Sequence, residues 1–455
     1  MGTTDVEVVV AGAGAAGLAS AIAAADGGAS VLLLEAHETF RSGSNTAMST
    51  SMIPGAGSRW QKKAGIDDSP DLLFGDIMAK TKGKADPVVA RALSDVSPRL
   101  VEWLADDCSV PLELVTDVWF PGNSRLRHHC VPDRAGRTLH RHLLDAASAR
   151  SGVTLVVPSR LTDVEEFDGA LRATATRPDG SQDVISVNSV ILATNGFGAN
   201  KEMVGRYIPE IVDGLYHGGD GSLGDALQIG ETLGAETASL GAYQGHGSVA
   251  SPHGVLLTWT TMMGGALLIN SDGRRFQNET IGYSESAVNV LTQPGSVAWA
   301  VFDRHVHEKA APFADYQDLM TMDAVKWVDD VEMLASLIGC APETIDQTLE
   351  TARRSAMAEA PDAFERSNWA HAISPPYAVV KVTGALFHTQ GGLKVNEDGV
   401  VLRHGSPIPG LYAAGGAAVG VSGDSSYGYV SGNGLLSALG LGLLAGSAAA
   451  VRATA

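Results

Sequence analysis

The chain has 455 residues, of which 45% are hydrophobic and 18% charged, and its formal net charge is −19. This composition excludes a disordered chain and is typical of a globular protein with more than one domain. The acidic balance argues against nucleic-acid binding, because an acidic surface repels phosphate. The three cysteines form no metal-ligand or disulfide pattern and the histidines show no metal-ligand spacing. With no basic leader segment visible, we expect a cytoplasmic protein without a metal site.

The first predicted element is a buried strand that runs into a glycine-rich turn. Residues 6–10 read VEVVV, and Gly12, Gly14 and Gly17 then form G-x-G-x-x-G. A helix is predicted over 15–25 and a second strand over 31–34. This order predicts dinucleotide binding, with the pyrophosphate at the helix N-terminus and a carboxylate on the ribose. The expected cofactor contacts here are Gly12, Gly14, Ala15, Ala16, Gly17, Glu35 and Ala36.

Two further strands run into glycine turns, over residues 190–198 and 410–416. Scattered junctions of this kind are typical of a doubly wound sheet that binds a ligand at the carboxyl ends of its strands. The predicted fold class is therefore α/β, with a Rossmann-like nucleotide domain split in sequence between 1–244 and 384–455. Residues 245–383 differ in texture and predict an inserted α+β capping or substrate domain, with a short strand over 266–270 and helices between 320 and 358.

One segment resembles a membrane span, because residues 434–451 contain no charged side chain. Its many glycines and alanines, and the glycine-rich loop before it, favour a buried helix instead. We expect no membrane span.

Five further motifs resemble one family. They are SGSNTA at 42–47, RRFQNE at 274–279, FHTQGG at 387–392, GLYAAG at 410–415 and GNG at 432–434. Together with the N-terminal fingerprint they resemble the FAD-dependent fumarate reductase and succinate dehydrogenase flavoproteins. The resemblance implies FAD, bound non-covalently because no histidine lies in 42–47. It implies these further cofactor residues: Ser42, Gly43, Ser44, Asn45, Thr46, Ala193, Thr194, Asn195, Gly196, Gly415, Gly416, Asn433, Leu435 and Leu436. Two of them depart from the pattern, since Asn195 stands where a glycine is usual and Gly416 where a glutamate is usual.

The residues expected at the reaction centre depart further. Tyr283 stands where the soluble fumarate reductases have a proton-delivering arginine, and Tyr429 where they have a carboxylate-clamping arginine. Trp259 and Met262 replace the two residues that relay protons, while His388 is retained. Fumarate reduction is therefore not expected unless other arginines substitute. The two tyrosines resemble those of the 3-ketosteroid Δ1-dehydrogenases and related cyclic-ketone desaturases.

That second resemblance implies a chemistry. Tyr283 would remove the α-proton of a ketone, for which its pKa of about 10 must be lowered. Tyr429 O–H and a backbone N–H near Gly434 would hold the developing oxyanion, and the β-hydride would pass to flavin N5. The alternative for each tyrosine is ordinary interior packing. Trp259 and His388 are expected to bind substrate, as are Trp119, Phe120 and Tyr427, for which packing is the stronger alternative.

A basic stretch over 125–142 bears on the substrate. It contains five arginines and four histidines in an acidic protein, so Arg125 and Arg127 are candidates for gripping a carboxylate. The alternative is a solvated face that pairs with nearby acids. The expected substrate is a small cyclic keto acid such as 4-oxocyclohexanecarboxylate, or a 3-ketosteroid, with oxygen, a quinone or a carrier as electron acceptor. Two other functions stay open: an enone or enoate reductase of the fumarate reductase type, and a non-catalytic redox sensor.

Overall fold

The computed structural model describes residues 6–120 and 122–454. The chain divides into two compact units. Unit 1 comprises Met1–Ile208, Gly218–Tyr243 and His388–Ala455, and unit 2 comprises Pro209–His217 and Gln244–Phe387. The chain thus leaves unit 1 and returns to it twice, and the longer excursion carries most of unit 2.

Unit 1 is built on a largely parallel sheet with the strand order β19-β20-β10-β1-β2-β6. Neighbouring strands are parallel from β20 to β6, and β19 is antiparallel to β20. All residues of β1 and β10 are buried, as their apolar sequences VVVA and SVIL predict for central parallel strands. The strands are β1 Val8–Ala11, β2 Val31–Leu34, β6 Val153–Val156, β10 Ser189–Leu192, β19 Val400–Arg403 and β20 Ser406–Ala413.

Smaller strands and the helices complete unit 1. The smaller strands are β3 Ile53–Pro54, β4 Glu113–Leu114, β5 His128–Cys130, β7 Arg160–Phe167, β8 Ala170–Thr176, β9 Gln182–Val187, β12 Thr237–Ala238 and β18 Gly392–Leu393. The helices are α1 Ala15–Asp26, α2 Phe40–Gly43, α3 Asn45–Met48, α4 Arg59–Lys63, α5 Pro70–Lys80, α6 Pro87–Asp106, α7 Gly136–Ser148, α8 Lys201–Tyr207, α9 Asp225–Thr232 and α16 Asn433–Thr454.

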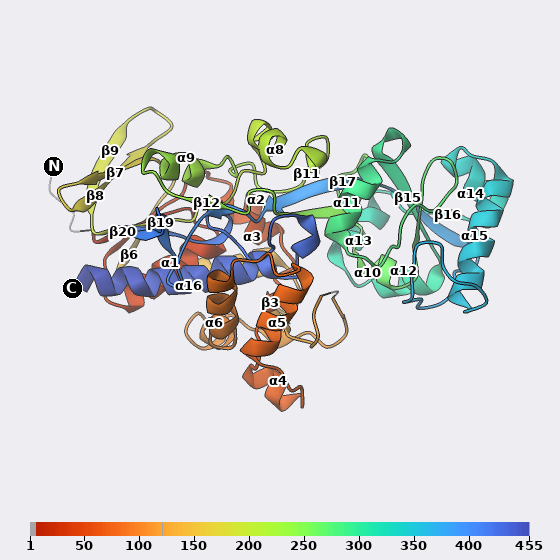
Figure 1. Ribbon diagram of the computed structural model, residues 1–455, viewed down its shortest axis with the longest axis horizontal. Helices are drawn as coiled ribbons and strands as arrows, with labels where there is room; N and C mark the ends of the chain where they lie inside the picture. Colours follow the sequence, from red (N-terminus) through yellow and green to blue (C-terminus); the bar gives the residue numbers. More distant parts are fainter. Residues whose placement is uncertain (1–5, 121, 455) are drawn as a thin grey trace. The chain divides into compact units, whose positions relative to one another are not determined.

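The apolar C-terminal helix α16 packs along α1 (Figure 1). A Cβ on Gly442 would come within 2.6 Å of the Ala16 carbonyl oxygen, and one on Gly446 within 2.3 Å of the Ser20 carbonyl oxygen. Glycine therefore permits a close backbone approach of the two helices. Residues 433–453 are long and apolar enough to cross a membrane, but 61% of their most apolar window is buried in the structure, which is the pattern of a core helix.

Unit 2 contains a mixed sheet with the order β11-β17-β15-β14, in which β13 and β16 also pair with β17. Side chains of β15 alternate between two cores: Ala300 and Phe302 pack with Val306 and Tyr316, while residues 299 and 301 face the opposite core. Its strands are β11 Leu215–Tyr216, β13 Tyr243–Ala250, β14 Leu267–Ile269, β15 Val297–Phe302, β16 Lys326–Val328 and β17 Tyr377–Thr389. The first residue of β13 and the last two of β17, His388 and Thr389, belong to unit 1. The helices of unit 2 are α10 Thr260–Met263, α11 Tyr283–Leu291, α12 Arg304–Ala310, α13 Ala314–Thr321, α14 Val331–Ile338 and α15 Pro342–Ala356.

The predicted fold class is confirmed: a split Rossmann-like domain carries an α+β insertion. The sequence predicts domain boundaries at 244/245 and 383/384. The compact units change at 243/244 and 387/388. Unit 2 also includes residues 209–217, because β11 pairs with β17. A two-residue strand has too little pattern to be predicted from the sequence.

Candidate active site

The glycines of the fingerprint have different reasons to be glycine. Gly12 has φ +103°, and a Cβ there would lie 2.4 Å from the Ala193 carbonyl oxygen. A Cβ on Gly17 would lie 1.7 Å from the Gly12 carbonyl oxygen. A Cβ on Gly14, in contrast, would meet only Thr46 Oγ1, at 3.5 Å. The protein's own packing requires Gly12 and Gly17, whereas the open side of Gly14 suits a backbone that a ligand approaches.

Polar side chains hold the loop around Gly14 in place. Glu35 accepts hydrogen bonds from Ala13 N and His37 N, both at 2.8 Å, and Thr46 Oγ1 accepts one from Ala15 N at 2.9 Å. The Ala15 N–H is therefore occupied by the protein, and the proton of the Thr46 hydroxyl stays available for a phosphate oxygen. A carboxylate has acceptor capacity beyond two bonds, so Glu35 retains room for a ribose hydroxyl.

Buried polar atoms without partners fit a large polar cofactor at the carboxyl ends of the strands. Among the described residues, Thr194 Oγ1 follows β10, Ser159 Oγ follows β6 and Asn433 Oδ1 begins α16, and none of these atoms has a hydrogen-bond partner in the protein. A buried polar group without a partner is costly. FAD, whose phosphates, ribityl chain and flavin edge are polar, suits such a set.

The two departures from the family pattern are neighbours in space. Asn195 has φ +66°, the left-handed conformation in which glycine is usual and asparagine is tolerated. Its carboxamide accepts from Gly196 N at 2.9 Å and donates to Ser222 Oγ at 2.8 Å. A Cβ on Gly416 would lie 2.5 Å from Asn195 Oδ1. The Asn195 side chain therefore occupies the space into which a side chain at 416 would project.

The other predicted cofactor residues lie around the same end of unit 1. Ser44 caps α3 by accepting from Ala47 N at 3.3 Å, and Asn45 Oδ1 accepts from Gly219 N at 2.6 Å. The remainder lie in the turns after strands or at helix ends: Ala36 after β2, Ser42 and Gly43 at the end of α2, Ala193 and Gly196 after β10, Gly415 after β20, Ala16 in α1, and Leu435 and Leu436 in the first turn of α16.

In unit 1, Tyr429 lies beside His388. The two rings meet edge to face with centroids 5.8 Å apart, and Tyr429 is 7% exposed. His388 Nε2 lies 2.9 Å from the position that a Cβ on Gly434 would take, so a side chain there would displace the imidazole. Burial lowers the pKa of His388 to about 4, so this histidine is neutral at pH 7. The predicted residues Tyr429, Gly434 and His388 thus form one group.

In unit 2, Tyr283 lies in a group of aromatic rings. It is the first residue of α11, and its ring stacks on that of His246 with centroids 4.9 Å apart and planes at 14°. His246 also stacks on Phe387 at 5.3 Å and meets Trp259 edge to face at 5.4 Å. Burial lowers the pKa of His246 to about 3, so the imidazole is neutral and contributes stacking rather than charge. Tyr283 stands at the amino end of α11, where a helix dipole favours negative charge, and the first turn of this helix also contains Glu285.

Sequence reasoning missed His246 and Gln390. His246 belongs to no motif, and only the fold brings its ring onto that of Tyr283. Gln390 lies inside a quoted motif, at the position where the related flavoproteins have methionine, and it contacts His388 Nδ1 at 3.1 Å. A polar side chain in place of an apolar one was the signal that could have drawn attention to it.

The prediction that Arg127 grips a substrate carboxylate is wrong. Its side chain is 0% exposed and forms a bidentate pair with Asp68, with both N–O distances 3.0 Å. Its Nη1 also binds Asp76 at 2.5 Å. A substrate anion would have to displace a buried carboxylate, so Arg127 is a structural residue. Arg125, by contrast, is partly exposed and donates to the carbonyl oxygens of Asp67 and Ser124, which leave its charge unpaired in these contacts.

The rest of the basic stretch is less basic than its composition suggests. Burial lowers the pKa of both His128 and His129 to about 4, and that of His140 below its usual range. His128 contacts the Ser431 carbonyl oxygen at 2.9 Å and His140 that of Ala13 at 2.8 Å. These neutral histidines tie the stretch to the fingerprint loop and to the loop after Tyr429, and they add no positive charge at pH 7.

The predicted aromatic residues near this stretch differ in exposure. Phe120 packs edge to face on His128, with ring centroids 4.9 Å apart. Trp119 is 51% exposed and Tyr427 is 60% exposed, with Lys82 Nζ over the Tyr427 ring at 5.6 Å. Within unit 1, Phe120 is therefore a packed residue, while Trp119 and Tyr427 are surface aromatic residues.

The motif at 274–279 has a structural role inside unit 2. Arg275 forms a bidentate pair with Glu279, at 2.9 and 2.8 Å, and also binds Asp362 at 2.6 Å. Arg366 binds the same Glu279 at 2.9 Å, and the side chains of Glu279 and Arg366 are 0% exposed. This buried ionic group anchors the segment that ends, four residues after Glu279, at Tyr283.

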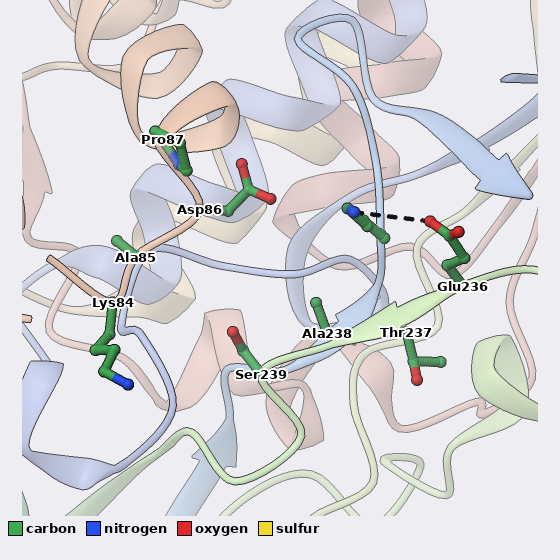
Figure 2. A pocket seen from close by; sticks show the side chains of 9 residues that line it. Lys84, Ala85, Asp86, Pro87, Glu236, Thr237, Ala238 and Ser239 are labelled. Carbon is green, nitrogen blue, oxygen red and sulfur yellow. Dashed lines mark ion pairs between the residues drawn. The ribbon is translucent and has the colours of Figure 1, made fainter. Parts of the chain in front are cut away.

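A hollow elsewhere on unit 1 contains none of the predicted site residues. Figure 2 shows its lining. Asp86 caps α6 by accepting from Val88 N and Val89 N, and Glu236 accepts from Gly405 N and pairs with Lys394 at 3.7 Å. Its polar groups therefore serve the protein's own helix end and turns.

Comparison with known proteins decides the family. The model of the FAD binding domain family matches residues 7–432. The chain belongs to this family. Its relatives include a fumarate reductase and a 3-ketosteroid dehydrogenase, and an FAD binding domain accords with the partnerless polar atoms and the open face of Gly14.

Similar proteins include an NADH:fumarate oxidoreductase from Klebsiella pneumoniae, 30% identical over 98% of this chain and 48% of its own length. The chain thus spans about half of that relative. An open-conformation flavocytochrome c3 fumarate reductase structure has a TM-score of 0.83 at 27% identity, covering all of this chain and 80% of that one. A 3-ketosteroid-Δ4-(5α)-dehydrogenase structure from Rhodococcus jostii has a TM-score of 0.76 at 26% identity, covering 98% and 97%.

Proposed function

We propose that the protein desaturates a cyclic ketone to an enone. The observation that carries this proposal is the pair of tyrosines, Tyr283 and Tyr429, which stand where the fumarate reductases have arginines. A dicarboxylate needs cations, and the site residues of unit 1 supply a neutral imidazole, a phenol and backbone N–H groups instead. Such donors suit a neutral carbonyl oxygen.

The chain's own residues divide the reaction. Tyr429 O–H and a backbone N–H near Gly434 hold the carbonyl oxygen as negative charge develops on it, which acidifies the neighbouring α-carbon. Tyr283 then takes the α-proton, and the amino end of α11 favours its phenolate form. FAD, held by the loop around Gly14 and by the turns after the strands of the unit 1 sheet, would supply the acceptor for the β-hydride, so that two hydrogens leave the ketone in all. The stacked rings of His246 and Phe387 hold the phenol of Tyr283 in one orientation.

FAD is bound non-covalently in this proposal. The loop over 42–47 contains no histidine to which a flavin could be attached. Acid precipitation of the purified holoprotein is therefore expected to leave the flavin in the supernatant, whereas a yellow pellet would contradict non-covalent binding.

A test of the reaction is the anaerobic mixing of holoprotein with saturated ketones and with enones. We expect cyclohexanone-type ketones or 3-ketosteroids to bleach the oxidised flavin, with the enone as product. The same chemistry run backwards is the alternative that the names of the relatives favour. It predicts that only enones or enoates react, and then only with reduced flavin. If the flavin absorbance changes with none of these compounds, the non-catalytic redox sensor is the remaining hypothesis.

Arg125 decides between acid and neutral ketones. Its contacts with the Asp67 and Ser124 carbonyl oxygens leave its charge unpaired, and it is the remaining candidate of the two arginines for a substrate carboxylate. We expect Arg125→Ala to weaken the binding of 4-oxocyclohexanecarboxylate more than that of its neutral ester. Equal effects on both compounds would exclude the keto acid as the preferred substrate and favour a neutral ketone. Turnover in these assays requires an electron acceptor. Oxygen and a quinone are tested directly, and a redox dye replaces a carrier.

A further inference from the structure

A chain of hydrogen bonds inside unit 1 ends on His388. Asn433 Nδ2 donates to Ser422 Oγ at 3.4 Å, Ser422 Oγ donates to Gln390 Oε1 at 3.1 Å, and Gln390 Nε2 lies 3.1 Å from His388 Nδ1. The first three residues of this chain are at most 4% exposed. Each link has a direction, because the serine that receives an amide N–H has its own proton left to give.

The direction of the last link determines where the proton of His388 lies. A carboxamide nitrogen only donates, so Nδ1 must accept, and a neutral imidazole then carries its proton on Nε2. The Thr389 carbonyl oxygen lies farther away, 3.4 Å from the same Nδ1, and would require the opposite tautomer. The shorter contact from an amide already oriented by Ser422 is the stronger of the two.

The Nε2 atom of His388 lies near the residues proposed to bind the substrate carbonyl oxygen. It is 2.9 Å from the position of a Cβ on Gly434, at the start of α16, and its ring contacts that of Tyr429. We propose that Gln390 holds His388 as the Nε2–H tautomer, so that His388 Nε2–H and Tyr429 O–H together donate to the substrate carbonyl oxygen. The donor role rests on the proposed function, whereas the tautomer does not. Gln390 acts through His388 and is a positioning residue.

The tautomer can be measured without turnover. In holoprotein labelled with 15N-histidine, the ring nitrogens of His388 are assigned by their loss in His388→Asn. We expect a protonated Nε2 and an unprotonated Nδ1. In Gln390→Met the donor to Nδ1 is gone, and we expect the proton to move to Nδ1 and the Thr389 carbonyl. Gln182→Met, at an exposed glutamine of β9, is the control and keeps the wild-type spectrum. A protonated Nδ1 in the wild type, or an unchanged tautomer in Gln390→Met, would overturn the proposal.

Because Gln390 is buried, Ser422→Ala serves as a second variant, since it removes the hydroxyl that orients the amide. Binding of phenol, a planar mimic of an enolate, is followed by the absorbance change of oxidised FAD. We expect affinity to fall about tenfold, the value of one hydrogen bond to a developing charge, with FAD content unchanged. A shifted tautomer with unchanged phenol affinity would overturn the donor role. If the tautomer shifts as expected but no ketone or enone ever reacts in the wild type, the proposed function fails and the tautomer assignment stands.

Discussion

The ring of Tyr283, in unit 2, stacks on a neutral imidazole among other aromatic rings, whereas Tyr429, in unit 1, lies beside a chain of hydrogen-bonded amides and hydroxyls. The first arrangement orients a phenol at a helix N-terminus by ring stacking. The second arranges donors around one point. The difference fits the two proposed roles, because a base needs orientation and a favourable field, and an oxyanion site needs several aimed donors.

Removal of the two hydroxyls gives the largest expected effect and tests this contrast. Tyr283→Phe is expected to slow ketone-driven flavin reduction by about a thousandfold or more, because it removes the base. Tyr429→Phe is expected to slow it by about a hundredfold, because other donors remain. Anaerobic stopped-flow absorbance measures both. The reverse order of effects would exchange the two roles.

A second prediction concerns how much the buried ionic group around Glu279 stabilises the segment that leads to Tyr283. Glu279→Gln leaves the buried Arg275 and Arg366 without full compensation and is expected to lower the free energy of unfolding by about 3–5 kcal/mol. Glu350→Gln, which breaks the exposed pair with Arg353, is the control and is expected to leave the unfolding midpoint nearly unchanged. Denaturant unfolding measures both variants. Similar small losses in the two would show that the buried group contributes little.

A third prediction concerns FAD binding and the space that Asn195 and Gly416 share in unit 1. Gly416→Glu forces a side chain into the space of the Asn195 carboxamide, and overpacking of this kind costs about 1–3 kcal/mol, a loss of about tenfold to a hundredfold in FAD affinity. Adding Asn195→Gly, which suits φ +66°, is expected to restore binding. Fluorescence titration of the apoprotein with FAD measures this cycle. If the two substitutions lower FAD affinity additively in the double variant, the side chains at 195 and 416 do not compete for one space.

The two histidines beside the tyrosines predict the smallest effect, a pH dependence of stability. Burial lowers their pKa values from 6.5 to about 3 for His246 and about 4 for His388. As pH falls below 6.5 the unfolded chain binds these protons and the folded chain does not. The stability from these two groups is therefore full above pH 6.5 and is lost from there down to about pH 4 for His388 and about pH 3 for His246. His246→Phe keeps a stacked ring and is expected to reduce the slope in this window by about 1.4 kcal/mol per pH unit. An unchanged slope would mean that His246 is not buried as a neutral ring.

Much of the fold could be predicted from the sequence because its signals are local. The strand, turn and helix around Gly12 and Gly17 follow from neighbouring residues, and so do the turns after β10 and β20. The site depended on contacts between distant residues. The pairing of Arg127 with Asp68 and Asp76 joins residues more than fifty positions apart, and nothing around Arg127 indicates that it is buried. The stack on His246 is hidden for the same reason.

The most direct measurement of the central claim is exchange of ketone α-protons with solvent. Holoprotein with its FAD reduced cannot accept hydride, so only the proton step remains. In D2O, NMR of the ketone is expected to show deuterium entering the α-carbon with wild type, more slowly with Tyr429→Phe, and at the uncatalysed rate with Tyr283→Phe. Exchange at the wild-type rate in Tyr283→Phe would contradict the account.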